Sequence, residues 1–154
     1  MSPRKKVLNA RNLLMFGWPV ILIGLLFLMK DQFFGVEASA GRKLYEQHCA
    51  SCHMEEGQGL RALIPPVAGA DYVAEQDVAT LACLIRYGMQ GPIVVNGKTY
   101  NQAMPGVASL TPSEVTSLIN YLRRGWGDNG PVVKYGQVET ALDSCEQTVG
   151  KAKK

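Results

Sequence analysis

The chain has 154 residues, a length that suits one domain with short extensions. It carries 16 Lys and Arg against 13 Asp and Glu, and 47% of its residues are hydrophobic. The positive excess lies at the two ends, because residues 35–150 hold eight basic and twelve acidic side chains and so a net charge of −4. No basic stripe is interleaved with aromatic residues, and nucleic-acid binding is therefore not expected.

The first predicted element is an apolar helix. Seventeen residues without a charge run from Leu13 to Met29. At about 1.5 Å per residue this run spans roughly 25 Å, and Phe33 and Phe34 can extend it toward the ~30 Å of a hydrocarbon core. We therefore expect residues 1–34 to form an N-terminal flank and a transmembrane anchor that contacts membrane lipid through residues 13–34.

The charges around this run predict its orientation. Arg4, Lys5, Lys6 and Arg11 precede it, which places the N-terminus in the cytoplasm and everything after the anchor outside the cytoplasmic membrane, in the periplasm of a bacterium. A cleaved signal peptide is the alternative, because 38–40 (Ala-Ser-Ala) satisfies the small-residue rule for cleavage. Both interpretations export the domain that follows, where disulfides are allowed.

Residues 35–39 form a short spacer, and a helix is predicted from Ala40 to Cys52. Its face is marked by Gly41, Tyr45 and Cys49, which are spaced by four residues. Residues 40–130 are taken as one domain, and 131–154 as a C-terminal tail with weak helical periodicity.

The end of this helix carries the sequence Cys49-Ala50-Ser51-Cys52-His53. Two thiols three residues apart, followed at once by an imidazole, are the attachment signature of one covalent haem c: the thiols become thioethers and the histidine binds the iron. The alternatives are a thioredoxin-like pair of cysteines, which normally accompanies a βαβ pattern, and half of a zinc site. His48 is either a further ligand or, as we expect, an ordinary histidine.

The remaining elements follow in order. An apolar loop with two prolines occupies residues 60–70, and a helix is predicted from Glu75 to Tyr87. A hairpin is predicted from Gly91 to Tyr100, because Asn-Gly at 96–97 is the strongest two-residue turn signal. Thr111 and Glu114 form a capping box that opens the last core helix, which ends near residue 124.

A second iron ligand is expected opposite His53. Met1, Met15 and Met29 belong to the anchor or its flank, and Met54 adjoins His53 and so cannot reach across the ring. Met89 and Met104 remain, and Met104 is preferred because it lies in a glycine- and proline-bounded loop. The alternative for Met104 is an ordinary core methionine.

These features together resemble a class I (mitochondrial-type) cytochrome c domain. The resemblance covers residues 40–127 and includes Gly41, Tyr45, the Cys49–His53 motif, the proline loop, the hairpin, Met104-Pro105 and residues 118–122. It implies an all-α cytochrome c fold with a small β-hairpin. It also implies that the first and last helices cross at Gly41, with Tyr45 near Tyr121.

The resemblance further implies the surroundings of the cofactor. The carbonyl of Pro65 should accept a hydrogen bond from His53, and Tyr100 should lie close to the haem. Cys83 and Cys145 depart from the family pattern. In an exported protein this leftover pair suggests a disulfide, and the alternative is two separate small buried residues.

The predicted function is single-electron transfer in a respiratory chain, either as a carrier or as a subunit of a quinol-oxidising or terminal oxidase or reductase complex. Its partners would be a redox protein donor and acceptor, with no small-molecule substrate and no catalytic residue of its own. The alternatives are the electron-exit subunit of an exported dehydrogenase and a haem-based gas or redox sensor.

Overall fold

The computed structural model describes residues 18–19, 21–26, 39–126 and 130–152, and the side chains up to 145. The chain forms two units, Met1–Val36 and Glu37–Lys154. Residues 18–19 and 21–26 of the first unit are helical, and the rest of the predicted anchor lies outside the described residues. Among the residues that are described, no helix is long and apolar enough to cross a membrane.

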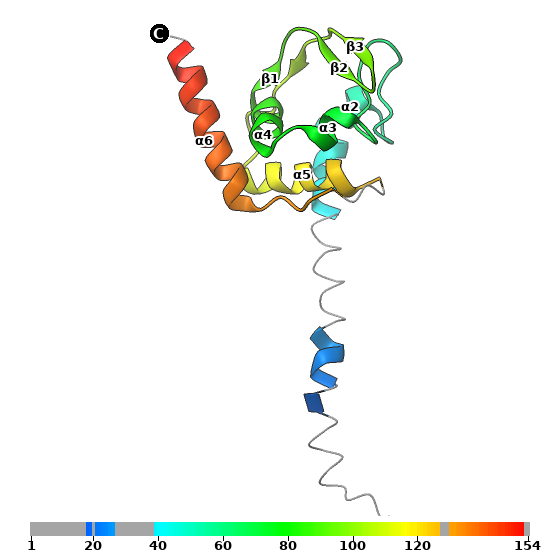
Figure 1. Ribbon diagram of the computed structural model, residues 1–154, viewed down its shortest axis with the longest axis vertical. Coiled ribbons are helices and arrows are strands. Elements are labelled where there is room, and N and C mark those ends of the chain that lie inside the picture. The colour runs from blue at the N-terminus through cyan, green and yellow to red at the C-terminus, as the bar shows by residue number, and fades with distance from the viewer. Residues whose placement is uncertain (1–17, 20, 27–38, 127–129, 153–154) are drawn as a thin grey trace, which may run out of the picture. The chain divides into compact units, whose positions relative to one another are not determined.

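The second unit is mainly helical, as predicted, and carries two small two-stranded sheets. In Figure 1, α5 lies across the base of this unit and α6 packs beside α4. A helix over residues 39–48 comes first. The elements that follow are α2 (Ala50–His53), α3 (Asp71–Glu75), α4 (Val78–Tyr87), β1 (Gly88–Met89), β2 (Ile93–Val95), β3 (Lys98–Tyr100), β4 (Met104–Pro105), α5 (Pro112–Arg124) and α6 (Tyr135–Ala152).

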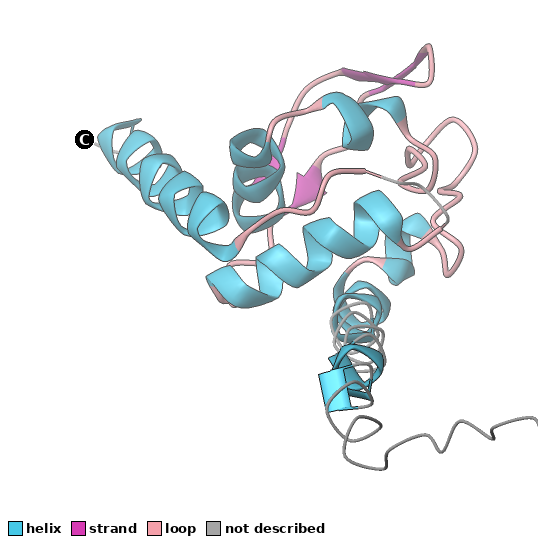
Figure 2. Ribbon diagram, turned by 60° about the horizontal axis from the view of Figure 1, so that its bottom comes forward, coloured by secondary structure: helices cyan, strands magenta, loops and turns pink. Residues whose placement is uncertain are grey.

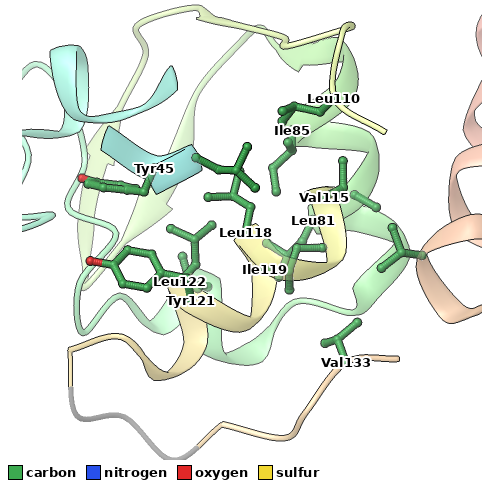
Figure 3. Close-up of a cluster of buried hydrophobic side chains, with 14 of the residues drawn as sticks. Tyr45, Leu81, Ile85, Leu110, Val115, Leu118, Ile119, Tyr121, Leu122 and Val133 are labelled. Atoms are coloured by element: carbon green, nitrogen blue, oxygen red, sulfur yellow. The ribbon is translucent and has the colours of Figure 1, made fainter. Parts of the chain in front are cut away.

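Helix α5 supplies the centre of the core. Its predicted capping box is confirmed, because the backbone N–H of Glu114 donates to the Thr111 hydroxyl at 3.3 Å and that of Thr111 to the Glu114 carboxylate at 2.7 Å. The apolar stripe that follows is buried and points toward α4 (Figure 3). It comprises Val115, Leu118, Ile119 and Leu122.

The first helix crosses α5 at Gly41, as the resemblance implied. A Cβ atom built on Gly41 would collide with the Ser117 carbonyl oxygen and lie 2.6 Å from the Cβ of Tyr121. The rings of Tyr45 and Tyr121 lie 5.7 Å apart, and Trp126 packs edge-on against Tyr45 at 5.2 Å. The missing side chain of Gly41 therefore lets two helix backbones approach closely enough for these rings to be in contact.

The region before α4 differs from the prediction. A single helix was expected from Glu75, whereas α3 ends at that residue and α4 begins at Val78. Gln76 is extended, and the Asp77 carboxylate accepts from the Thr80 N–H at 2.6 Å, so Asp77 caps a new helix.

Arg123 provides the partner that the separate helix α3 needs at its end. Its side chain is 6% exposed and donates to the carbonyls of Val73 and Gln76, which lack partners within the helix. The Arg123 side chain therefore joins α5 to α3.

The predicted hairpin is confirmed as β2 and β3, which pair Val95 with Lys98 around the Asn-Gly turn. Asn96 also has a second role. Its backbone N–H donates to the Asp71 carboxylate at 2.8 Å, and its side-chain oxygen accepts from the Asp71 N–H at 2.9 Å. This reciprocal pair ties the hairpin to the start of α3.

The other sheet was not predicted. Strand β1 pairs with β4, so that Gly88 lies opposite Pro105 and Met89 opposite Met104. Met104 was placed in a loop because two-residue strands are too short to leave a period-2 pattern in the sequence.

The weak helical periodicity of the C-terminal tail corresponds to a long helix, α6 (Tyr135–Ala152). Figures 1 and 2 show it extending away from the rest of the unit toward its C-terminal end. A disulfide between Cys83 of α4 and Cys145 of α6 is present, with their Cα atoms 5.7 Å apart. The expected disulfide is thus confirmed, and it closes a loop worth about 4 kcal/mol in the chain-entropy model.

We predict that Gly41→Ala lowers the free energy of unfolding by about 1–3 kcal/mol, because the added methyl group meets backbone and Cβ atoms that cannot move aside. The control is Gly136→Ala on α6, whose Cβ would meet no atom within 4 Å. It should change stability by less than about 1 kcal/mol. Urea unfolding followed by circular dichroism measures both, and equal effects at the two positions would contradict the crossing.

Candidate functional site

One large cavity opens into the second unit. Its lining is mostly apolar. Its walls come from α3, α4, α5 and the β2–β3 hairpin, with residues such as Val73, Ile85, Val95 and Leu118. A flat hydrophobic ligand is the kind of group that such walls accept.

The predicted motif lies at this cavity. Cys49, Cys52 and His53 all line it, and both thiols are free. The backbone N–H groups of Cys52 and His53 both donate to the Cys49 carbonyl, at 3.1 and 2.9 Å, so one tight turn presents all three side chains. Burial, with Cys52 as the second cause, raises the pKa of the Cys49 thiol to about 11, which leaves it neutral at pH 7.

His53 is held in one orientation. Its Nδ1 lies 3.0 Å from the carbonyl oxygen of Pro65, which can only accept, so Nδ1 carries the proton and Nε2 keeps a free lone pair. Burial lowers the pKa of His53, and the hydrogen bond that Nδ1–H donates to the Pro65 carbonyl opposes this in part. The imidazole is thus neutral at pH 7, which is the form that binds a metal. The contact that the resemblance implied for Pro65 is present.

Gly59 makes that contact sterically feasible. A Cβ on Gly59 would lie 2.6 Å from the carbonyl oxygen of Pro65, and its φ of +67° is one that side chains rarely adopt. Its N–H donates to the His53 carbonyl at 2.9 Å. The sequence analysis assigned no role to Gly59, although its position between the histidine and the prolines was a usable signal.

Met104 and Tyr100 also line the cavity, as predicted, and so do Met89 and His48. Tyr100 is buried at the end of β3. His48 is exposed and lies directly before Cys49 on the same stretch of helix as His53. Both candidate methionines, Met89 and Met104, therefore line the cavity. Their presence in the lining does not by itself decide which of them would bind the iron.

The rival interpretation as a zinc site finds no support among the residues described. Within them, no group of three or more His, Cys, Asp and Glu side chains is arranged to hold a bare metal ion. Two interpretations of the Cys49–His53 motif therefore remain: attachment of a larger prosthetic group, and thiol chemistry.

The comparison with known families decides between these. The model of the family described as "Cytochrome c" matches residues 38–126, which include the motif, the proline loop, the hairpin and Met104. This chain belongs to the cytochrome c family. The predicted class I assignment and the helical fold of this domain with small hairpins are therefore confirmed.

Several relatives support the assignment. The chain is 38% identical to cytochrome c-552 of Thermus thermophilus over 91 residues. This alignment covers 57% of this chain and 69% of the Thermus protein. Over 98 residues it is 36% identical to the cytochrome c subunit of the quinone alcohol dehydrogenase of Gluconobacter oxydans, covering 63% of this chain. Over 91 residues it is 31% identical to the CcoP subunit of the cbb3-type cytochrome c oxidase of Rhodobacter capsulatus, covering 58% of this chain.

The two complex subunits are longer proteins than the matched region. The aligned part spans 20% of the Gluconobacter subunit and 31% of the Rhodobacter subunit.

A cytochrome c domain implies haem c with iron, and the residues present fit this group. Two free thiols and a neutral imidazole with a free Nε2 line one apolar cavity. The thiols suit thioether attachment, the imidazole suits iron, and the thioether of Met104 suits the second axial position.

We predict that His53→Ala abolishes the low-spin spectrum of the haem-loaded protein, while the haem stays bound through Cys49 and Cys52. His48→Ala is the matched control, because it removes the neighbouring imidazole, and it should leave the spectrum unchanged. Electron paramagnetic resonance and optical absorption measure both. A low-spin spectrum that survives loss of His53 but not of His48 would reverse the assignment.

Proposed function

We propose that this protein is a membrane-anchored mono-haem cytochrome c that transfers single electrons in a respiratory chain. The observation that carries the proposal is the placement of His53 on α2 and Met104 on β4 around one cavity. With both axial positions filled, no iron site is left for a substrate. When bound, haem c supplies a one-electron ferric/ferrous couple.

The residues around the cavity have distinct parts in this function. Cys49 and Cys52 tie the group to the chain, and Pro65 keeps the His53 imidazole aligned. Apolar walls exclude water, which disfavours the more highly charged oxidised state, and the Met104 thioether acts in the same direction. The reduction potential of the haem iron would therefore be comparatively high.

Tight packing suits this role as well. The Gly41 crossing holds the first helix against α5, and the Cys83–Cys145 disulfide holds α6 against α4, which lines the cavity. A site whose walls are fixed by such contacts needs little rearrangement when one electron arrives or leaves.

Membrane attachment is supported by the sequence. The uncharged run from Leu13 to Met29 and the basic flank before it favour an anchor with the N-terminus in the cytoplasm and the haem domain outside the cytoplasmic membrane. Tethering keeps donor and acceptor at a high effective concentration without any new contact.

A second candidate is the electron-exit subunit of an exported dehydrogenase. The similarity to the cytochrome c subunit of a quinone alcohol dehydrogenase favours it, since the haem domain would be the same in both roles.

We predict that membranes from cells producing the full chain retain its covalent haem after washing with alkaline carbonate, and that detergent releases it at the mass of the intact chain. Haem staining after denaturing electrophoresis measures this. Co-purification with stoichiometric flavin, quinone or molybdenum protein would favour the dehydrogenase role. Release by carbonate alone would contradict the anchor.

The rim of the cavity is nearly free of charge. The described residues that line the cavity include no Asp, Glu, Lys or Arg side chain. Residues 62–70 and 87–113, which supply about half of this lining, contain a single charged side chain, Lys98 at the start of β3. Exposed Gln102, Ala103 and Pro105 line the opening. Redox partners therefore dock here through apolar contact, and charge steering contributes little to their encounter.

We predict that electron self-exchange between two copies of the haem-loaded protein rises only weakly with ionic strength, because the net charges of −4 on residues 35–150 of the two copies repel but the contact surface itself adds little charge. Ala103→Lys should slow exchange at low salt, because two like charges then meet across the contact, and added salt should restore it. Thr140→Lys on α6 adds the same charge away from the rim and should have little effect. Nuclear magnetic resonance line broadening measures the rate, and equal effects of the two variants would exclude docking at this rim.

A further inference from the structure

Two thioethers face the same space. Met89 on β1 and Met104 on β4 are directly opposite each other in an antiparallel pair. Side chains at opposed positions of such a pair project from the same face, with Cβ atoms about 4.5–5.5 Å apart. Both residues line the cavity and both are partly buried.

The pairing is held firmly by two glycines. A Cβ on Gly88 would collide with the Met104 carbonyl oxygen, and one on Gly106 would collide with the backbone of Tyr87. The N–H of Val107 also donates to the Ile85 carbonyl at 2.8 Å, which ties the end of β4 to α4. The two methionines thus keep their relative position, and only their side chains are free to reorient.

We propose that Met89 is a reserve axial ligand that binds the iron when Met104 dissociates. This rests on the proposed axial role of Met104. In the exchange, the bond between iron and the Met104 sulfur breaks and a bond to the Met89 sulfur forms, and no electron or proton moves. A methionine side chain has three rotatable bonds, which is enough to bridge the separation of two opposed residues.

Other donors at the cavity are less suited. The Tyr45 hydroxyl donates to the Met54 carbonyl at 2.6 Å, and His48 directly precedes Cys49, on the stretch that supplies His53. Met89 is the second thioether on the Met104 side of the cavity, because the β1–β4 pairing places it opposite Met104. A haem that regains a thioether stays six-coordinate and remains closed to small gases.

The test follows methionine methyl groups labelled with ¹³C in the reduced, haem-loaded full chain. A methyl group on an iron-bound thioether lies over the porphyrin ring and is shifted far upfield. Wild type and Met89→Leu should show one such signal from Met104. Met104→Ala should also show one, now from Met89, and the double variant should show none. Met104→Leu, which nearly preserves volume, repeats the comparison if the alanine variant is unstable.

Carbon monoxide binding gives a second readout. If Met89 keeps the iron occupied about nine-tenths of the time in Met104→Ala, the double variant should bind carbon monoxide about ten times faster. Equal rates in the two variants, with no shifted methyl in Met104→Ala, would overturn the reserve role and leave the proposed function intact. A wild-type signal that survives Met104→Ala but disappears in Met89→Leu would instead overturn the assignment of Met104 itself.

Discussion

The close crossing of the first helix and α5 at Gly41 is the contact on which the site depends. The first helix leads directly into the turn that bears Cys49, Cys52 and His53, and α5 provides Leu118 and Leu122 of the facing wall. A side chain at position 41 would separate these helices, because the Ser117 carbonyl already occupies the space. The rings of Tyr45, Tyr121 and Trp126, packed at tilted and edge-on angles, lie beside the crossing.

The side chains at the site carry little unpaired charge. Burial favours the neutral form of His53, and its Nδ1–H donates a hydrogen bond to the Pro65 carbonyl. Arg123 is buried nearby in the core, but its side chain is engaged by the backbone carbonyls of Val73 and Gln76. A cavity with apolar walls and an almost uncharged rim suits a carrier that exchanges electrons by brief contact and takes up no substrate.

Helix α6 is an addition to this frame. The family match ends at residue 126, and α6 begins at Tyr135. Its buried residues Val138, Ala141 and Leu142 pack into the core, and the disulfide fixes α6 to α4. Because α4 lines the cavity and runs on into β1, this extension supports the wall that carries Met89.

Features that depend on near neighbours in the chain could be predicted from local sequence patterns. The spacing of Cys49, Cys52 and His53, the Asn-Gly turn and the capping box of Thr111 and Glu114 are local patterns, and each was found where it was predicted. Local chemistry suffices there because the interacting groups lie within a few residues of one another.

Tertiary structure alone decided the rest. The pairing of Met89 with Met104, the role of Gly59 beneath Pro65 and the use of Arg123 to end α3 join residues that are well separated in the chain. Strands of two residues leave no periodic signal, and a glycine or an arginine looks the same in sequence whether its partner is solvent or a distant backbone. These contacts exist because packing brings the segments together, and no local preference encodes them.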